Sequence, residues 1–425
     1  MRFPFLALAF VLAASTVPTR AQTAAGTGPL TLAQALRLAE TANPAVRARE
    51  AEMAAAEGGR REAASPLFNN PELSVERTRR QATAPDGGAR EWGIGIAQPF
   101  EIGGQQARRR EVASAAMDAL RAEIEDARRQ ARSEASLRFH AVLAVQRRIQ
   151  LEQRSVDLFE STAQAVEKRR SAGEDTRLDA NVALIEAERA RNALAAAQEQ
   201  LLDAKGELAT VLQLPPSAVP ELVGDLGLPT GAALPYGLEQ LLASAQALPR
   251  QRALNARETA ARARVDLERA SRYPDVTVGL HVGREGPSDG RERVTTLSLS
   301  VPLPLFRRND AAIGQAMSEA TRAEIERAAT TRDAQAQVRR LWSRLESQRE
   351  RLARLQRAML AASTDNKRLA ERSRQAGQIG LLDQLLVHRQ ALDAERDLNE
   401  ALAEYHATRI ELESAAGWSQ QGTEK

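Results

Sequence analysis

A chain of 425 residues is long enough for two or three ordinary domains, or for a fused pair of similar halves. Aromatic residues make up only 3% and hydrophobic residues 43%, so most apolar surface must come from Ala, Leu and Val, which suits thin, closely packed helices and disfavours a compact globular enzyme. Charged residues reach 27% but the formal net charge is only +3, and both signs alternate along stretches such as 339–357, which is typical of solvated helix surface and disfavours a nucleic-acid-binding face.

The N-terminus has the pattern of a secretory signal peptide. Arg2 precedes an apolar run over residues 3–14, and Thr19-Arg20-Ala21 stands ahead of a polar segment. This arrangement predicts a signal over residues 1–21, cleavage after the alanine and an exported mature chain. A buried first helix is the alternative interpretation, but prolines bracket the run and a helical period is absent.

The remainder of the sequence lacks cysteines and long apolar runs. Without cysteine there is no disulfide, no thiolate metal site and no lipidated cysteine. After the signal, no run approaches the roughly 18 apolar residues that a membrane-spanning helix needs. If the mature chain crosses a membrane, it must therefore do so as a closed β-barrel.

The mature sequence contains an internal repeat. Four landmarks recur 203 to 205 residues apart. They are Pro44 and Pro249, Pro71 and Pro274, Pro99 and Pro302, and Gly173 and Gly377. We therefore predict two structural repeats, over residues 22–220 and 221–425, each with the order helix, two strands, long helix, tight turn and returning helix.

Each repeat contains a predicted β-hairpin, over residues 71–100 and 274–302. In both, strands with one apolar face and one small or polar face flank a turn-rich segment, at 85–88 and 286–290. The apolar residues of this pattern are Leu73, Val75, Trp92, Ile94, Ile96, Val276, Val278, Leu280, Val282, Leu297, Leu299 and Val301. A soluble β-sandwich would also alternate, but strands of about ten residues with an apolar outside also fit a transmembrane barrel, and export favours the barrel.

A very long helical hairpin follows each β-hairpin, over residues 105–212 and 310–416. Residues 105–172 and 315–376 contain neither Pro nor Gly. Each segment therefore predicts one helix of roughly 100 Å, far longer than helices of globular proteins. The chain then reverses in a tight turn and returns as a shorter helix.

The returning helices, 176–212 and 381–416, leave about half of each long helix without a neighbour. A short helix at 32–40 precedes a second at 45–64, and the latter has the missing length, as does its counterpart at 251–271. Each of these two helices would stack end to end with the returning helix of its repeat, and the pair would run along the whole long helix. Each repeat would then contain one long helix and one composite strut, that is, a rod built from two shorter helices. A filamentous coiled-coil protein is the simpler interpretation of Ala/Arg/Glu-rich helices, but it does not explain the two β-hairpins.

Two segments resemble signatures of the outer-membrane efflux (TolC) family. Residues 98–105, QPFEIGGQ, resemble the QPFELGGK motif of its heavy-metal, CzcC-like branch, with Gln105 where that branch has lysine. Residues 301–309, VPLPLFRRN, resemble the VPLPLFxRN motif of the same branch. The reversals AGEDT at 172–176 and AGQIG at 376–380 resemble the family's periplasmic helix tips.

This resemblance implies a mainly α fold with a small transmembrane β part. Long helical hairpins would form a periplasmic tunnel, and four strands per chain would contribute to a twelve-stranded barrel of a homotrimer in outer-membrane lipid. The chain would be the channel subunit of a tripartite efflux system, a passive duct docked onto a periplasmic adaptor (membrane fusion) protein and an inner-membrane pump of the RND type. An adaptor, the competing class, would carry one helical hairpin flanked by small β-domains, whereas here the hairpin occurs twice.

The helix tips carry the residues expected to dock the adaptor. Gly173 and Gly377 permit the tight reversals between antiparallel helices. Thr176, Ile379 and Gly380 would then be presented to the periplasm. A plain turn without a partner is the alternative.

Two aspartates near the tips are candidates for a periplasmic gate. Asp179 and Asp383 stand six residues after their tip glycines, and three copies of Asp383 around one axis would form a ring that attracts cations. The resemblance implies the same, since the family narrows its entrance with acidic residues there, although Leu386 stands where some relatives carry a second one. We expect Asp383 to be the constriction. Asp179 would be its latch, paired with Arg374 or Arg177, and helix capping is the alternative role of both aspartates.

Signs of catalytic, cofactor or metal chemistry are weak in this sequence. Phosphate-binding glycine loops and the HExxH motif are absent, so we expect no enzyme and no cofactor. The four histidines are scattered, which favours surface or packing roles over metal binding. They are His140, His281, His388 and His406. The branch resemblance indicates heavy-metal cations as cargo, with small organic compounds as the alternative because no Met or His ladder is evident.

Overall fold

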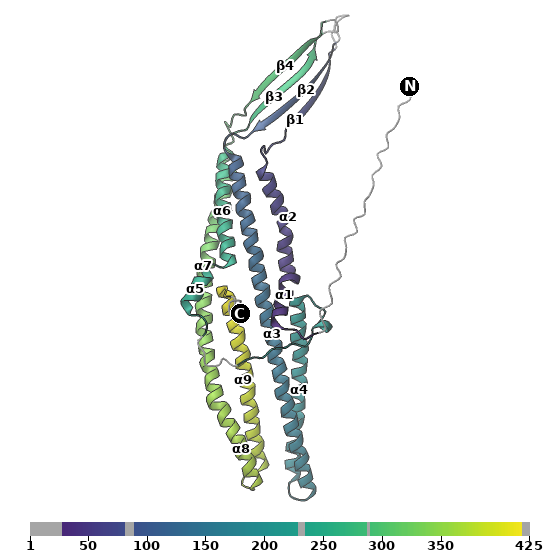
Figure 1. Ribbon diagram of the computed structural model, residues 1–425, viewed down its shortest axis with the longest axis vertical. Helices are drawn as coiled ribbons and strands as arrows, with labels where there is room; N and C mark the ends of the chain where they lie inside the picture. The colour runs from purple at the N-terminus through teal and green to yellow at the C-terminus, as the bar shows by residue number, and fades with distance from the viewer. Residues whose placement is uncertain (1–27, 81–88, 228–233, 287–289, 419–425) are drawn as a thin grey trace, which may run out of the picture.

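The computed structural model describes residues 28–80, 89–227, 234–286 and 290–418. Long helices run side by side through most of the molecule, and four strands stand together at one end (Figure 1). The signal peptide predicted over residues 1–21 lies outside the described residues. The elements are α1 (Leu32–Ala42), α2 (Pro44–Ala64), β1 (Glu72–Arg80), β2 (Ala89–Phe100), α3 (Gln105–Ser171), α4 (Arg177–Leu212), the 3₁₀ turn η1 (Pro216–Ala218), α5 (Leu238–Gln246), α6 (Pro249–Ala270), β3 (Val276–Glu285), β4 (Glu292–Ser300), α7 (Asp310–Arg354), the π-helical segment η2 (Leu355–Leu360), α8 (Ala361–Gln375) and α9 (Leu381–Ala416).

The predicted helices are present, and prolines and caps mark where several begin. Pro44 is the first residue of α2, where its missing N–H would have had no helical partner, and the Asn43 side chain accepts a hydrogen bond from the backbone N–H of Ala45 at 2.9 Å. Pro249 begins α6 in the same way. Helix α3 runs unbroken for 67 residues, which corresponds to about 100 Å.

Each repeat builds one long and one composite strut, as predicted. Helices α2 and α4 follow one another along α3, while α6 and α9 follow one another along α7 (Figure 1). Helix α3 also packs against α6 and α9, so the two repeats interlock. No helix among the described residues has both the length and the hydrophobicity of a membrane span.

Small side chains allow the helices to approach closely around thin cores. In the cluster shared by α1, α3 and α4, the buried residues include four alanines and one aromatic ring, namely Ala35, Ala39, Ala131, Ala135 and Phe139. A second cluster joins α5, α7 and α9. The low aromatic content is thus compatible with well-filled cores, because alanine fills the space between close helices.

The second long helix differs from the predicted continuous helix over 315–376. It begins at Asp310, where the predicted hairpin over 310–416 also begins, but its turns widen to a π-helix at η2 before α8 continues. A π turn needs neither Pro nor Gly, so the absence of both did not exclude it. Leu355 and Leu360, five residues apart, both pack against the core of α5, α7 and α9, and the i to i+5 spacing of a π turn brings such a pair to one face.

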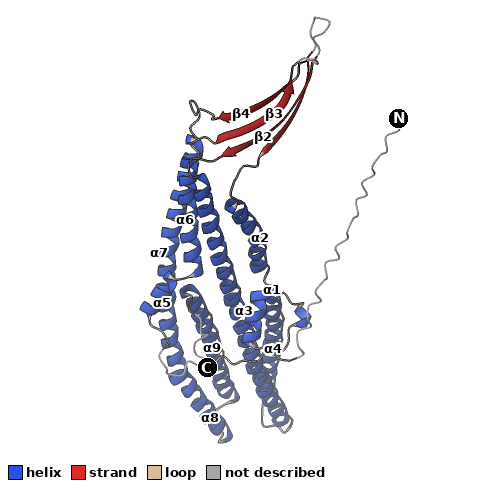
Figure 2. Cartoon of the chain, turned by 45° about the horizontal axis from the view of Figure 1, so that its top comes forward, coloured by secondary structure: helices blue, strands red, loops and turns tan. Residues whose placement is uncertain are grey.

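The four strands form one antiparallel sheet in the order β1-β2-β3-β4, labelled in Figure 1 and coloured red in Figure 2. The two predicted hairpins are therefore joined through β2 and β3. The turn predicted at 85–88 and most of the turn at 286–290 lie outside the described residues. Strands β1 and β4 are the edges of the sheet.

The register aligns the apolar residues in rows across all four strands. One row is Leu73, Ile96, Leu280 and Leu297, and the next is Val75, Ile94, Val282 and Thr295. The edge-strand leucines and valine are 71 to 77% exposed, so no described part of the chain covers this face, which we call the apolar face of the sheet. On the opposite face, Gly93 and Gly95 leave space that the His281 ring occupies.

Candidate functional site at the helix tips

Both helix tips reverse the chain through a glycine with positive φ. The φ angles are 84° at Gly173 and 69° at Gly377, and each glycine N–H donates to the carbonyl three residues earlier at 3.0 Å. A Cβ built at either position would meet nothing within 4 Å, so the backbone conformation rather than space requires glycine. The tight reversals are confirmed, and their role in docking stays a prediction.

Each predicted gate aspartate caps the helix that returns from its tip. The backbone N–H and hydroxyl of Thr176 donate to Asp179 Oδ2 at 3.1 and 2.6 Å, and the Asp179 N–H donates to the Thr176 hydroxyl. These bonds to Thr176 hold the pKa of Asp179 below its usual value. In the second repeat, the Gly380 N–H donates to Asp383 Oδ2 at 3.2 Å. Capping is therefore one role of both aspartates, and the gate role of Asp383 stays a prediction.

Arg374 pairs with a different aspartate from the one expected. Its Nη2 lies 3.4 Å from Asp175 Oδ1, while Arg169 Nε lies 2.9 Å from the other carboxylate oxygen. The Asp175 side chain is only 11% exposed. Because Asp175 belongs to the first tip and Arg374 to α8, this ion pair joins the two hairpins directly.

The expected pairing of Arg374 or Arg177 with Asp179 is not formed among the described residues. Asp179 Oδ2 accepts both bonds from Thr176 in the helix cap, whereas Arg374 contacts Asp175. Comparison of the two repeats could not reveal Asp175, because its counterpart 204 residues later is Ile379. The sequence signal was a pair of acidic residues, Glu174 and Asp175, inside one of the two reversals.

The residues expected at the docking surface differ in exposure. Thr176 and Gly380 are exposed, whereas Ile379 is half-buried and its carbonyl accepts a hydrogen bond from Arg374 at 3.4 Å. Sequence reasoning gave no role to two exposed leucines beside the tips, although their apolar nature at a predicted solvent-facing turn was a visible signal. They are Leu178 and Leu382, and Leu386 nearby is exposed as well.

The lower part of α9 is packed into the first hairpin. Leu381 and Leu385 of α9 belong to one buried cluster with Val156 and Phe159 of α3 and Ala187 of α4. The candidate gate residue Asp383 therefore sits on a helix that the first hairpin holds in place. Any outward movement of this helix would have to open that contact.

A buried ion pair holds α9 to α3 farther from the tips. The Glu152 carboxylate, with a side chain 1% exposed, accepts hydrogen bonds from Arg396 Nε and Nη2 at 2.9 and 2.5 Å. Bonding to Glu152 raises the pKa of Arg396. A two-point guanidinium contact of this kind fixes the relative position of the helices as well as their charge balance.

The four histidines lie apart from one another except for one stacked pair. The rings of His140 and His406 are 5.6 Å apart between centroids, and each has one nitrogen 2.8 or 3.1 Å from a backbone carbonyl. His388 is buried between α8 and α9, with Nε2 3.8 Å from Glu371 Oε1. Burial lowers the pKa of all three rings, so they are neutral at pH 7.

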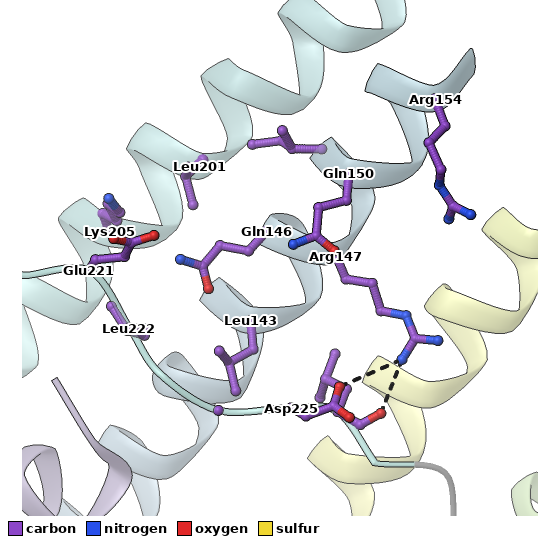
Figure 3. A pocket seen from close by; sticks show the side chains of 13 residues that line it. Leu143, Gln146, Arg147, Gln150, Arg154, Leu201, Lys205, Glu221, Leu222 and Asp225 are labelled. Carbon is purple, nitrogen blue, oxygen red and sulfur yellow. Dashed lines mark hydrogen bonds and ion pairs between the residues drawn. The ribbon is translucent and has the colours of Figure 1, made fainter. Parts of the chain in front are cut away.

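A groove of about 870 Å³ lies between α3, α4 and the segment 221–226 (Figure 3). Gln146 and Gln150 line it together with Lys205, and Arg147 lies 4.0 Å from Asp225 at one end. The described lining contains no Ser, Thr, Cys or His side chain. Within the described ranges, no three His, Asp or Glu side chains gather closely enough to hold a metal ion.

One segment matches a catalytic motif in its order and spacing of residues. Residues 286–290 read GPSDG, which fits the GxSxG pattern of serine hydrolases. In those enzymes the motif forms a sharp turn between a strand and a helix, and this turn exposes the nucleophilic serine. Here it falls between β3 and β4 in the chain order, and residues 287–289 lie outside the described residues.

Comparison with known proteins gives one family and several related folds. The family model described as outer membrane efflux protein matches residues 35–212 and 238–418. The cobalt-zinc-cadmium resistance protein CzcC of Cupriavidus metallidurans is 28% identical over 397 residues, covering 92% of this chain and 88% of that protein.

Solved structures with a similar fold include an outer-membrane channel and an outer membrane protein. The outer-membrane channel OprN superposes with a TM-score of 0.77 at 21% identity, covering 92% of this chain and 90% of that one. The outer membrane protein VceC of Vibrio cholerae gives a TM-score of 0.74 at 18% identity, covering 91% and 97%. At these identities the likeness concerns the fold.

Proposed function

This chain belongs to the outer membrane efflux protein family, and we propose that it is a passive export duct for heavy-metal cations in a tripartite efflux system. The family and fold are those of channels rather than enzymes. Family members are outer-membrane channels that extend into the periplasm, act as trimers and work with an adaptor and an inner-membrane pump. For this chain, we infer the same placement after removal of a signal over residues 1–21, and the same partners, with a pump of the RND type.

The observation that carries the proposal is a sheet with an uncovered apolar face mounted on helices about 100 Å long. An exposed apolar area this continuous is unusual on a soluble monomer and fits contact with lipid. Both sheet edges are free in one chain, so three chains can join β4 to β1 around a closed sheet of twelve strands. The helices of the three chains would then enclose the duct.

The tips of the helical hairpins would form the entrance. Exposed Asp383 would provide a ring of three carboxylates around the axis, and Asp179 would support it as the cap of the neighbouring hairpin. The ion pair between Arg374 and Asp175 is a further candidate for the latch, since it links the two hairpins that must separate on opening. The reversals at Gly173 and Gly377, with Thr176, Ile379 and Gly380, would receive the adaptor.

The cargo is inferred from the relative whose name specifies cobalt, zinc and cadmium resistance. An acidic entrance favours cations, which agrees with that cargo. Small organic compounds are the alternative cargo, because the groove beside α3 and α4 mixes apolar and polar residues and the described residues contain no cluster that selects a metal.

Metal accumulation in whole cells tests the proposal. A strain without this chain should retain more zinc, cobalt and cadmium than its parent, and a plasmid copy should restore export. Unchanged metal content together with increased retention of an organic dye would assign the duct to organic cargo. Unchanged retention of both would contradict an efflux role.

A further inference from the structure

An arginine row borders the apolar face of the sheet at the end away from the helices. Beyond the two apolar rows, the next row across the strands is Arg77, Trp92, Arg284 and Arg293. Arg79 and Arg90 pair one step farther along. Because successive residues of a strand point to opposite faces, all five arginines share the face of the apolar residues. We call these five the arginine belt.

The acidic residues of the same strand ends lie on the other face. Four glutamates each stand next to a belt arginine in the same strand, so their side chains point to the opposite face. They are Glu76, Glu91, Glu285 and Glu292. Glu91 is buried there and accepts the Gly286 N–H at 3.2 Å. The sheet thus separates its charges by face, with cations alone on the apolar side.

The belt arginines have no anionic partner within the described part of the chain. All five are exposed, and none lies within 4.0 Å of a described carboxylate. Arginines of the helices, such as Arg109 with Glu101, commonly do form such pairs. Several uncompensated guanidinium groups on one surface attract anions from outside the chain.

The spacing of the belt from the helices matches a lipid layer. From Val301, which directly follows β4, to Arg293, an extended chain rises about 27 Å along its own direction. A tilt of about 40° turns this into a height of about 20 Å, and the exposed side chains of Leu303 and Leu305 extend the apolar band towards the helices. Trp92 lies in the belt row, and tryptophan is enriched where hydrocarbon meets headgroups.

We propose that the arginine belt binds the phosphate groups of an anionic glycolipid in the outer leaflet of the membrane, of the lipid A type. The inference rests on the proposed function, which places the helices in the periplasm and this end of the sheet at the outer surface. Guanidinium groups bind phosphate through two parallel hydrogen bonds, which lysine cannot reproduce. Three chains would repeat the belt around the channel and bind several lipids at once.

The test compares lipid binding by the purified trimer and two variants in nanodiscs of zwitterionic lipid. The belt variant is Arg77→Gln/Arg284→Gln/Arg293→Gln. The control variant, Arg339→Gln/Arg340→Gln/Arg344→Gln, removes the same charge from exposed positions of α7. The probes are bisphosphorylated lipid A, monophosphoryl lipid A and phosphatidylglycerol.

We expect the belt variant to bind bisphosphorylated lipid A at least tenfold more weakly than the wild type and the control. The wild type should also prefer it to both other lipids. Equal affinities for the belt and control variants would overturn the inference, and so would equally tight phosphatidylglycerol binding or loss of the trimer in the belt variant alone.

The same experiment separates this inference from the proposed function. Failure of both wild type and control to insert into nanodiscs would contradict the membrane placement itself. Normal insertion without any dependence on lipid phosphate would contradict the belt alone. Neither measurement uses cargo, adaptor or pump.

Discussion

The buried negative charge of Glu152 on α3 is balanced mainly by one side chain from another helix, Arg396 of α9. Arg396 contributes two hydrogen bonds, whereas Arg148 lies 3.7 Å away and is half exposed. Removing Arg396 would leave a buried carboxylate without its main partner, which typically costs about 3–5 kcal/mol. The second α3–α9 pair, Arg154 with Glu395, is largely exposed and should contribute about 0–1 kcal/mol.

We therefore expect Arg396→Ala to lower the free energy of unfolding by about 3–5 kcal/mol. Arg154→Ala removes the same side chain from the same helix interface and serves as the control. Denaturant unfolding of both variants provides the measurement. Similar losses in the two variants would mean that the Glu152 pair is not energetically distinct.

The proposed entrance ring can be tested at one position. Asp383→Ala should reduce cation selectivity in planar bilayers and weaken block by multivalent cations added from the periplasmic side, because the ring would lose its negative charge. Leu386 lies one helical turn farther along α9 and is 54% exposed, so a carboxylate placed there would add negative charge. Leu386→Asp should therefore strengthen the block by multivalent cations. Unchanged selectivity and block in both variants would leave Asp383 as a helix cap only.

The sequence was informative about residues that the repeat duplicates and uninformative about those it does not. The tip glycines and the two capping aspartates recur at one spacing, and each occupies the expected turn. Asp175 has no acidic counterpart, and its partner Arg374 is 199 residues away, so only the folded chain could bring them together. A contact between repeats leaves no local pattern in the sequence.

At the scale of elements, the ion pair between Arg374 and Asp175 is one of the contacts that hold the hairpins together near the entrance. Arg374→Ala should increase the open fraction and the mean conductance of the reconstituted channel, because it removes a contact that opening must break. Arg169→Ala is the matched control, since Arg169 contacts the same carboxylate from within the first hairpin. Equal conductance of both variants and the wild type would show that this pair does not restrain the entrance.

The tips themselves are the second element-scale test. Replacing Gly173 and Gly377 with leucine places side chains in open space but forces them into positive φ, at a cost of about 1–2 kcal/mol each. The trimer should therefore persist while efflux is lost through misshapen tips. Gly206→Leu, in the interior of α4 with equally open surroundings and no positive φ, is the control. Normal export by the double variant would argue against docking at the tips.

Element boundaries followed from prolines, glycines and periodicity, but helix type did not. The prolines at the starts of α2 and α6 stop the preceding helix by a local steric rule, which sequence reasoning can apply. The π-helical η2 depends on where Leu355 and Leu360 meet a core built by α5 and α9, far away in sequence. Likewise, the β2–β3 pairing across the repeats was visible only in the fold.

At the scale of the whole molecule, four strands cannot close a sheet on themselves. Closed membrane sheets of single chains begin at about eight strands, so two, three or four copies of this chain would be needed for eight, twelve or sixteen. The antiparallel order leaves β1 free on one edge and β4 on the other, and joining β4 of one chain to β1 of the next repeats the same geometry at every seam.

The composite struts also leave apolar side chains such as Leu184, Ile185 and Leu202 exposed along α4, where a neighbouring chain would cover them. Because family members act as trimers, we expect an obligate trimer, and native mass measurement in detergent should give three copies of the chain with no folded monomer on dilution. A stable monomer that still conducts ions would contradict this expectation, because one chain would then enclose a pore with only four strands.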